Sequence, residues 1–403
     1  MHRPREQKQF SSFLNLKNTK GKDHCPAGRE ERLKALLFAN TDWYLYNFRL
    51  EYAKYLRSLG WEVCFLSPDG EHVSKLEEAG FRHISFDFSR KGINPIKETG
   101  TIRRIRRIYE EEQPDLVHHF TIKCVIYGSL AAQGLGIRSI VNSITGLGFV
   151  FLSNKPHVAM IRQVVKKMYK KALDGSQVIF ENPDDRALFL RMGLVHESNS
   201  HVILGTGIDT DIFVPVQPPN SIPLTILPAR MIWDKGIREF VEAATRIKEE
   251  GVKARFALIG SNDKGNPTCI SFDQLTQWQK EGNVEWWGWQ DDVPTIISMS
   301  HIVCLPSYRE GLPKILIEAA SCGRPIVTTD VPGCREVVTD GENGFLVPAK
   351  DPEKLKEALM KLIADEDLRN TMGEASREKA VHCFSNEIVN EGIYSIYQKA
   401  LDA

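Results

Sequence analysis

The stretch from residue 302 to residue 321 constrains the fold of this chain more than any other. Residues 302–305 form a short apolar run, which predicts a buried strand. Residues 307–311 are polar and predict a tight loop, and residues 312–321 have helical spacing, with Pro313 allowed in the first turn. Such a loop lies at the carboxyl edge of a parallel sheet, where open α/β folds bind ligands. The helix N-terminus carries a partial positive charge, which suits a phosphate.

Two carboxylates lie in this strand–loop–helix unit. Glu310 is in the loop, and Glu318 follows roughly 10 Å farther along, at about 1.5 Å per helical residue. A retaining glycosidase needs its two carboxyl groups about 5 Å apart, so this pair does not fit that chemistry. The pair could bracket a longer ligand such as a nucleotide-sugar, because carboxylates suit vicinal hydroxyls. The alternative is a plain helix start with one surface and one half-buried glutamate.

The residues around both glutamates also resemble a known signature. The sequence reads Pro306-Ser-Tyr-Arg-Glu-Gly-Leu-Pro313 and continues Glu318-Ala-Ala-Ser-Cys-Gly-Arg-Pro-Ile-Val327. This pattern is similar to the donor-site signature of glycosyltransferase family 4, whose members are retaining enzymes of the GT-B fold. Residues 227–347 match the family pattern almost throughout. The first half, from about residue 33, resembles a bacterial subgroup that builds surface polysaccharide or lipid-linked oligosaccharide.

The resemblance implies a fold and a donor site. The expected fold is α/β, with two Rossmann-like parallel-sheet domains that face each other across a cleft. Glu310 would hold the hydroxyls of the transferred sugar, and Glu318 would hold the ribose of the nucleotide. The further donor-binding residues expected from the signature are Gly311, Leu312, Pro313 and Lys314.

Two cations upstream complete the expected donor site. Arg230 and Lys235 lie at a strand end and a helix start, where two positive charges would meet a diphosphate. The family carries an Arg and a Lys at matching positions, so both are expected to stabilise the departing diphosphate as fixed positive groups. Trp289 is expected to pack on the nucleotide base, although an aromatic cluster there could also be core. The resemblance implies that no metal and no cofactor are needed.

Apolar runs alternate with helical segments on both sides of a proline-rich stretch at 209–221. This alternation predicts a parallel sheet in each half, and 403 residues are enough for two domains. Strands of the first half are expected at 33–39, 62–67, 82–86, 116–119, 139–144 and 177–181. The expected parts are a disordered leader at 1–30, an acceptor-binding domain at 31–215, a nucleotide-sugar-binding domain at 216–384 and, at 385–403, a helix that crosses back to the first domain.

The loops after the strands of the first half hold the candidate acceptor residues. Asn40 and Asp42 follow the first strand without a Gly-x-Gly-x-x-Gly, which argues against a dehydrogenase, and either could instead cap a helix. His119 is expected in a loop at a strand end, where a histidine could manage the acceptor proton. Lys123 matches a subgroup lysine and could hold a phosphate, and Gly146 could let the backbone approach a ligand. The alternatives are a buried strand histidine, a surface lysine and a plain turn.

Composition and charge limit the setting in which the chain works. No apolar run reaches 18 residues, so no membrane-spanning helix is predicted, and residues 1–22 lack the apolar core of a secretory signal. The eight cysteines are scattered without a Cys-x-x-Cys, which indicates reduced thiols in the cytoplasm. Residues 1–215 hold 31 Lys and Arg against 24 Asp and Glu, whereas the remainder hold 21 against 28, so the first half is expected to meet an anionic partner.

Two basic amphipathic runs, at 102–108 and 157–172, could lie on anionic lipid. The alternative is a helix with one core face and solvated charges. The expected partners are a nucleotide-sugar, with UDP as the nucleotide, a lipid-linked saccharide acceptor and the anionic inner face of the cell membrane, with no nucleic acid. The alternative functions are a UDP-sugar 2-epimerase of the same fold and a non-catalytic two-lobed ligand-binding protein.

Overall fold

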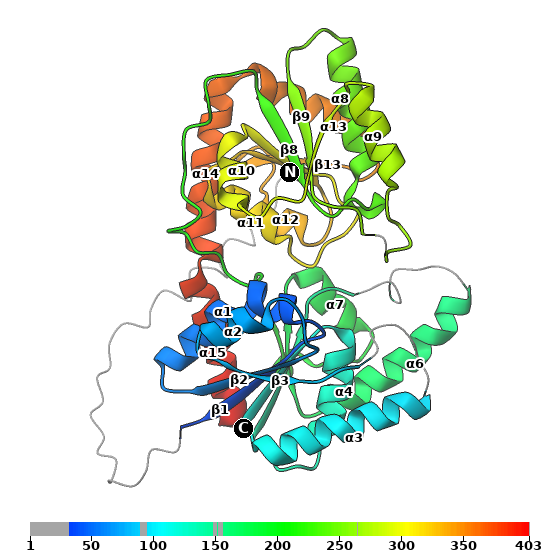
Figure 1. Cartoon of the computed structure of the whole chain (residues 1–403), viewed down its shortest axis with the longest axis vertical. Coiled ribbons are helices and arrows are strands. Elements are labelled where there is room, and N and C mark those ends of the chain that lie inside the picture. Colours follow the sequence, from blue (N-terminus) through cyan, green and yellow to red (C-terminus); the bar gives the residue numbers. More distant parts are fainter. Residues whose placement is uncertain (1–31, 89–94, 148–150, 152–155, 264, 403) are drawn as a thin grey trace, which may run out of the picture. The chain divides into compact units, whose positions relative to one another are not determined.

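The computed structural model describes residues 32–88, 95–147, 151, 156–263 and 265–402 (Figure 1). Residues 33–403 form one compact unit, which contains two parallel β-sheets. The expected leader at 1–30 lies outside the described residues. The division of the unit near residue 215 remains a prediction.

The first sheet has seven strands in the order β3-β2-β1-β4-β5-β6-β7, and all neighbours are parallel. Its strands are β1 (Lys34–Phe38), β2 (Glu62–Ser67), β3 (Arg82–Ser85), β4 (Leu116–Phe120), β5 (Ser139–Ile144), β6 (Gln177–Phe180) and β7 (Ser200–Val202). The strand order reverses between β1 and β4. Ligands of open α/β folds bind outside the carboxyl ends of the strands at such a reversal.

Helices cover both faces of the first sheet. They are α1 (Asp42–Ser58), α2 (Val73–Glu78), α3 (Pro95–Glu112), α4 (Ile122–Ala132), α6 (Pro156–Ala172) and α7 (Pro183–Arg191), with a short helix η1 (Glu197–Asn199). On β1, Leu36 and Phe38 pack in one core with residues of α3, α4, α6 and α7, whereas Ala35 and Leu37 pack in the other core with α1 and α2. This division follows from the two-residue period of a strand.

Helix α15 (Asn386–Leu401) packs on the first sheet, although it follows the second sheet in the sequence. Its residues Val389, Ile393 and Tyr397 lie in the same core as α1. The hydroxyl of Tyr397 lies 2.7 Å from Nδ1 of His118 in β4. The apolar face of α15 therefore completes the core on this side of the sheet.

The second sheet has six parallel strands in the order β10-β9-β8-β11-β12-β13. They are β8 (Leu224–Pro228), β9 (Arg255–Ile259), β10 (Glu285–Gly288), β11 (Ile302–Leu305), β12 (Ile326–Thr329) and β13 (Gly344–Val347). The helices are η2 (Trp233–Lys235), α8 (Ile237–Glu249), α9 (Phe272–Lys280), α10 (Val293–Met299), α11 (Lys314–Ser321), α12 (Cys334–Val337), α13 (Pro352–Ala364) and α14 (Glu366–Phe384). Among the described residues, no helix is both long enough and apolar enough to cross a bilayer.

Three local features near the candidate site differ from those that the sequence predicted. Helix α1 begins at Asp42 and is capped by the hydroxyl of Thr41, so neither Asn40 nor Asp42 is the cap. Strand β4 continues to residue 120, so His119 is a strand residue and not a loop residue. Helix α11 begins at Lys314 instead of residue 312, because Pro313 has an extended backbone and occupies the cap position.

Candidate active site

The loop between β11 and α11, residues 306–313, is called the donor loop below. The amide of Tyr308 donates to the carbonyl of Asp234 at 2.9 Å, which ties the loop to the segment after β8. The hydroxyl of Thr329, at the end of β12, donates to the carbonyl of Ser307. The donor loop is therefore fixed at the carboxyl ends of β8, β11 and β12, at the edge of the sheet where the sequence predicted it.

Glu310 of the donor loop forms an ion pair with Lys235 of η2. Nζ of Lys235, from η2, lies 2.5 Å from Oε1 of Glu310, and the hydroxyl of Ser307 donates to the same oxygen at 2.6 Å. The side chains of Lys235 and Glu310 are only 19% and 13% exposed. The structure thus brings together two predicted catalytic residues that are 75 positions apart in the chain.

Arg230 and Trp289 follow the carboxyl ends of β8 and β10, and both are exposed. The Arg230 side chain is 59% exposed, and its Nη1 lies 2.9 Å from Oδ2 of Asp263 instead of pairing with Glu310. Trp289 is 58% exposed, and its ring nitrogen donates to Asp291 at 2.8 Å. Trp289 is therefore a surface residue and not part of the core, and its contact with a base stays a prediction.

Glu318 is a buried acid in α11. It is only 9% exposed, and burial raises the pKa of its carboxyl, whereas the charge of Lys314 acts in the opposite direction. Nζ of Lys314 lies 4.0 Å from Oε1 of Glu318 and donates to the carbonyl of Asn47, in α1, at 2.8 Å. Lys314 thus connects the start of α11 to the first sheet's helices.

Gly311 packs closely against the segments that follow β5 and β6. A Cβ at this position would lie 2.6 Å from the carbonyl oxygen of Thr145 and 2.8 Å from Oε2 of Glu181, so a larger side chain does not fit. The carbonyl of Gly311 accepts from Nδ2 of Asn182 at 2.8 Å. The Glu181 carboxylate lies beside the Leu312 amide, which favours the charged form of Glu181.

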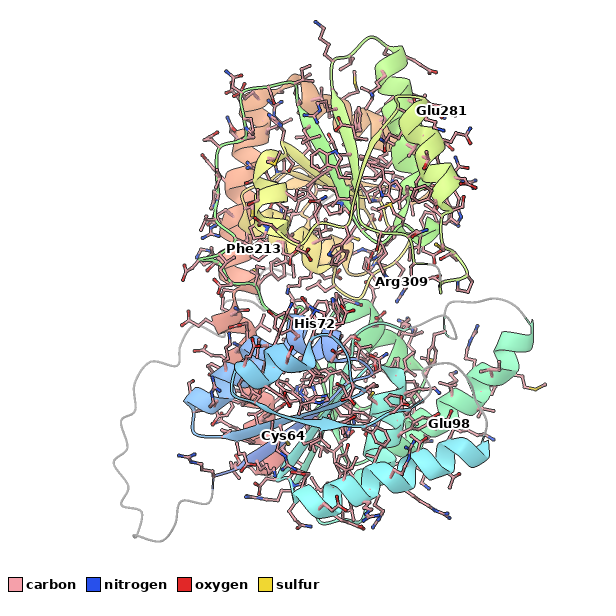
Figure 2. The ribbon with its side chains drawn as sticks, in the orientation of Figure 1. Cys64, His72, Glu98, Phe213, Glu281 and Arg309 are labelled. Carbon is pink, nitrogen blue, oxygen red and sulfur yellow. The ribbon has the colours of Figure 1, made fainter. Side chains whose placement is uncertain are left out.

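The sequence did not identify the residues of the first sheet that touch the donor loop. Glu181, Asn182 and Asp185 follow β6, and Asp185 forms an ion pair with Arg309, which Figure 2 labels. A local signal was present: Asn182 before Pro183 is a typical cap and first helical residue, directly after a predicted strand. That signal marks a carboxyl strand end, which is where functional side chains of such sheets gather.

Two of the predicted acceptor residues share a cavity of about 220 Å³ beside the first sheet. It is lined by Asn40, Phe88, Thr121, Ile122 and Lys123. Thr121 has φ 70° and ψ 154°, a conformation that β-branched residues rarely adopt and that clusters at ligand sites. Lys123 lies in the first turn of α4 and pairs with Glu98, labelled in Figure 2, at 3.0 Å.

The other two acceptor candidates have different surroundings. Asp42 is 7% exposed, and its Oδ2 accepts from the amide of His72 at 2.7 Å, so it stabilises the segment after β2. Gly146 has φ 141°, and no atom of the described residues lies within 4 Å of a Cβ built there. It follows Thr145, whose carbonyl faces the donor loop at Gly311.

The predicted placement of His119 is wrong. The residue is fully buried, and its ring nitrogens lie 3.0 Å from the Tyr109 hydroxyl and 2.9 Å from Oδ1 of Asn142. Burial lowers the pKa of His119 to about 4, which keeps the ring neutral at physiological pH. A group that manages a substrate proton must reach that substrate. His119 therefore fits a structural role in the core.

Two Asp-x-Asp triplets occur in the chain, a pattern that can hold a metal in some transferases. The carboxylate of Asp209 accepts from the amides of Asp211 and Ile212 in its own turn. The carboxylate of Asp365 caps α14 by accepting from the amide of Leu368. Within the part of the chain that the structure describes, no group of three or more His, Cys, Asp or Glu side chains could hold a metal ion.

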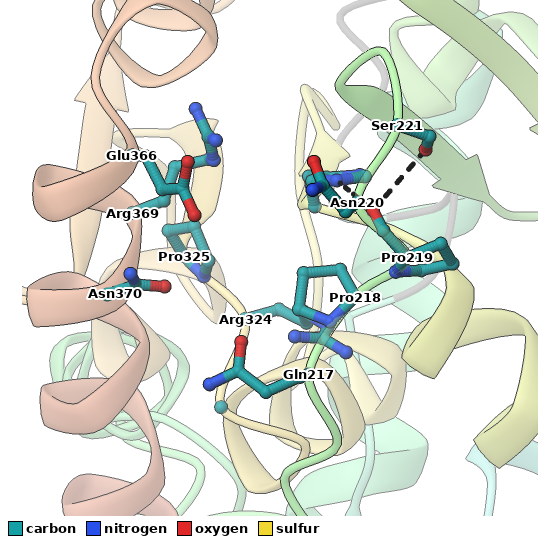
Figure 3. Close-up of a pocket in the computed structure, with 12 residues that line it drawn as sticks. Gln217, Pro218, Pro219, Asn220, Ser221, Arg324, Pro325, Glu366, Arg369 and Asn370 are labelled. Carbon is teal, nitrogen blue, oxygen red and sulfur yellow. Dashed lines mark hydrogen bonds between the residues drawn. The ribbon is translucent and has the colours of Figure 1, made fainter.

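A second cavity, of about 280 Å³, lies beside the residues that precede β8, β11 and β12 (Figure 3). Arg324 donates to carbonyls of α10, and Arg369 donates to carbonyls of α13, so both guanidinium groups act at the C-terminal ends of helices. The donor loop follows β11 at its opposite end. This cavity is therefore not part of the candidate site.

Two family descriptions match the chain. Residues 210–379 match "Glycosyl transferases group 1", and residues 34–182 match "Glycosyl transferase 4-like". The chain therefore carries a group 1 glycosyltransferase domain and a glycosyltransferase 4-like domain, and it is a glycosyltransferase. The first matched segment holds Arg230, Lys235, Glu310 and Glu318, and the second holds the acceptor candidates.

Relatives of this glycosyltransferase are known from bacteria. One is the N,N'-diacetylbacillosaminyl-diphospho-undecaprenol alpha-1,3-N-acetylgalactosaminyltransferase of Campylobacter jejuni, 28% identical over 89% of this chain and 96% of the relative. Another is the UDP-Gal:alpha-D-GlcNAc-diphosphoundecaprenol alpha-1,3-galactosyltransferase of Escherichia coli, 26% identical over 73% and 78%.

Solved structures show the same fold. A glycosyltransferase from Rickettsia africae superposes with a TM-score of 0.76, at 21% identity, over 92% of this chain and 99% of that structure. Anabaena HepE, solved with UDP, superposes with a TM-score of 0.74, at 18% identity, over 91% and 100%. The two parallel sheets of this glycosyltransferase thus form the GT-B fold, as the sequence predicted.

Proposed function

We propose that this glycosyltransferase moves a hexose or an N-acetylhexosamine from a UDP-sugar to a membrane-anchored, lipid-linked saccharide, with retention of anomeric configuration. The observation that carries the proposal is the pair of Lys235 and Glu310 in the donor loop of a chain of this family. The relatives named for diphospho-undecaprenol acceptors and the neighbour solved with UDP support the class of each substrate.

On the donor side, the diphosphate lies at the N-terminus of α11, whose cap residue Pro313 provides no side-chain hydrogen bond to the first amides. The Lys235 ammonium interacts with both Glu310 and the diphosphate. The Arg230 guanidinium leaves its exposed ion pair with Asp263 and binds the diphosphate as well. These fixed positive groups stabilise the negative charge that grows on the departing UDP.

The two glutamates bind the two ends of the donor. Glu310 accepts hydrogen bonds from the sugar hydroxyls and shares the Lys235 ammonium with the diphosphate. Glu318 accepts from the ribose hydroxyls, and its burial makes such bonds strong, because water competes little for a carboxyl that is 9% exposed. Trp289, exposed beside β10, packs on the base.

On the acceptor side, the cavity at Asn40 and Lys123 binds the polar head of the lipid-linked saccharide. The first amides of α4 and the Lys123 ammonium favour a phosphate there. The strained backbone of Thr121, between β4 and α4, supports a ligand role for this cavity.

Helix α6 docks on the anionic inner face of the membrane in this proposal. Met160 and Val164 are 76% and 51% exposed and lie one turn apart, while Lys167, Lys170 and Lys171 are exposed on the same helix. Apolar side chains flanked by lysines are typical of helices that lie in a membrane interface. Each basic residue near such a surface contributes about 1 kcal/mol.

A product assay tests the reaction. Radiolabelled UDP-sugars are incubated with the enzyme and a diphospho-undecaprenol-linked saccharide, and both the lipid and nucleotide fractions are separated. Label in the lipid fraction, with an α-linkage by NMR, is the expected result. Label that stays in an isomerised UDP-sugar, or UDP-sugar binding without any product, would reject the proposed transfer.

A charge-reversal variant tests the membrane contact. Changing Lys166, Lys167 and Lys170 to Glu should release the enzyme from phosphatidylglycerol vesicles at low salt and leave UDP binding unchanged. Binding of the wild type should also weaken with salt, because exposed charges are screened. Unchanged co-sedimentation of the variant would contradict the proposed contact.

The matched control reverses the charge of three lysines outside α6. Lys253, Lys280 and Lys361 are exposed around the second sheet, and their reversal to Glu should leave vesicle binding in place. Loss of vesicle binding in this control would mean that overall charge, and not α6, determines the interaction.

A further inference from the structure

One peptide group of the donor loop is held from both sides by consecutive residues of the first sheet. The carbonyl of Gly311 accepts from Nδ2 of Asn182 at 2.8 Å. The carboxylate of Glu181 lies against the same peptide, where the Leu312 amide favours its charged form. Because a peptide group is planar, fixing its C=O and its N–H fixes the orientation of the whole plane.

The surroundings leave this peptide little freedom to move. A Cβ on Gly311 would come within 2.8 Å of Glu181 and within 2.6 Å of the Thr145 carbonyl. Asn182 is itself fixed, because its Oδ1 accepts from the amide of Asp185 at 2.8 Å as the cap of α7. Its amide group can therefore donate toward Gly311 in only one orientation.

The guanidinium of Arg49 lies close to the Glu181 carboxylate. Nη2 of Arg49 lies 3.9 Å from Oε1 of Glu181 and donates to the Tyr44 hydroxyl at 2.7 Å. The guanidinium also stacks over the ring of Phe120, with 4.1 Å to the centroid, and the residue is only 2% exposed. The other charged group that faces Glu181 is Asp185 of α7, which is paired with Arg309.

We propose that Glu181 and Asn182 are positioning residues for donor binding, which orient the Gly311–Leu312 peptide and hold the adjacent Glu310 in place for the sugar. The inference rests on the proposed function, and neither residue belongs to the donor-loop signature. The Arg49 charge favours the ionised form of Glu181, which lies beside the Leu312 amide. Without these two contacts the donor loop loses its fixed peptide next to Glu310.

The protonation state of Glu181 gives the test a readout that a purely structural role does not predict. Burial raises the pKa of Glu181 to about 7, while the Arg49 charge acts in the opposite direction. Above this pH Glu181 is a charged carboxylate and interacts more strongly with the Leu312 amide. Below it the group is neutral and holds the peptide less strongly. Donor use should therefore fall as the pH is lowered through about 7.

The experiment compares Glu181→Gln and Asn182→Ser with the wild type in full-length enzyme. Serine still caps α7, because its hydroxyl can accept from the helix amide, but it cannot reach the Gly311 carbonyl. The kcat/KM for UDP-sugar is measured from pH 5.5 to 8.5, with UDP titrations at the two ends. Glu197→Gln is the control, since Glu197 pairs with Arg186 of α7 at an exposed site outside the donor contact.

At pH 8, Glu181→Gln should lose about tenfold in kcat/KM, the scale of one charge-assisted hydrogen bond, and Asn182→Ser about three- to tenfold, the scale of a neutral one. At pH 5.5, the kcat/KM of Glu181→Gln should equal that of the wild type. In this variant the fall in kcat/KM as the pH is lowered through about 7, the acid limb of the profile, should be absent. Asn182→Ser should keep that limb at a lower rate, which tests the inference if the Gln variant does not fold. The control should behave as wild type.

Three results would overturn the inference: a Glu181→Gln variant with wild-type kcat/KM at pH 8, an unchanged acid limb in that variant, or tighter UDP binding. The last would mean that Glu181 competes with the donor for the Leu312 amide. A wild type that neither binds UDP nor transfers sugar rejects the proposed function instead, which is a different outcome.

Discussion

Replacing Glu310 with glutamine tests the centre of the donor site. The change keeps the shape of the side chain and removes its charge. Oε1 of Glu310 accepts from Lys235 at 2.5 Å and from Ser307 at 2.6 Å, so the charge-dependent part of two bonds is lost. Bonds to charged groups contribute about 1.5–3 kcal/mol and neutral ones about 0.5–1.5 kcal/mol. The gross attraction in the ion pair is larger, but lost hydration offsets most of it.

With the donor bound, the same difference applies to each bond between Glu310 and a sugar hydroxyl. A loss of about 1.5 kcal/mol corresponds to slightly more than a factor of ten in rate, so kcat/KM for transfer should fall tenfold or more in Glu310→Gln. UDP lacks the transferred sugar that would contact Glu310, so its Kd should change little.

The assay follows radiolabelled sugar into the lipid fraction, and calorimetry measures the Kd of UDP. Glu353→Gln is the control, because it removes another ion-paired glutamate, 48% exposed and bonded to Arg246, far along the chain from the donor loop. Transfer by Glu310→Gln at a near-normal rate would remove Glu310 from the sugar site.

Three further perturbations have defined outcomes. Arg230→Ala and Lys235→Ala should each lower turnover by about 10²-fold, the scale of losing one electrostatic stabiliser. EDTA should leave transfer by the wild type intact. If EDTA abolished transfer and Mg²⁺ restored it, a metal would have the role proposed for Arg230 and Lys235. The pKa of His119 is depressed to about 4 in the folded protein, so its contribution to stability is complete above about pH 6.5 and is lost as the pH falls through 4. This loss amounts to about 3 kcal/mol, and urea unfolding of His119→Gln should show a flatter pH dependence than the wild type. Tyr397→Phe should lower the free energy of unfolding by about 1–2 kcal/mol, because it removes the hydroxyl bonded to His118, and an unchanged UDP affinity would separate this effect from the donor site.

The donor loop could be predicted because its information is local. A strand, a polar loop and a helix within 20 residues place Glu310 at a carboxyl strand end. Lys235 follows β8, and β8 is the neighbour of β11, so parallel pairing brings the two side chains to the same edge. Neither step requires knowledge of distant packing.

Other parts of the site depend on long-range contacts that the sequence does not display. His119 lies at the end of a predicted strand, and only its partners Tyr109 and Asn142 show that the strand continues and encloses the ring. Asn182 is 129 positions from Gly311, and no local pattern relates them. No local sequence pattern indicates the ion pair between Arg230 and Asp263 either.

The order in which the chain is synthesised gives the position of α15 a further consequence. Roughly 180 residues, including the whole second sheet, separate β7 from α15, and at about 5–20 residues per second a ribosome needs about 10–40 s to make them. During that time the apolar face formed by Ala35, Leu37 and their neighbours lacks the helix that covers it. A nascent chain with such a face is prone to aggregate. The yield of this enzyme in a cell should therefore depend on chaperone capacity during translation, and slowing translation between β7 and α15 should lower it.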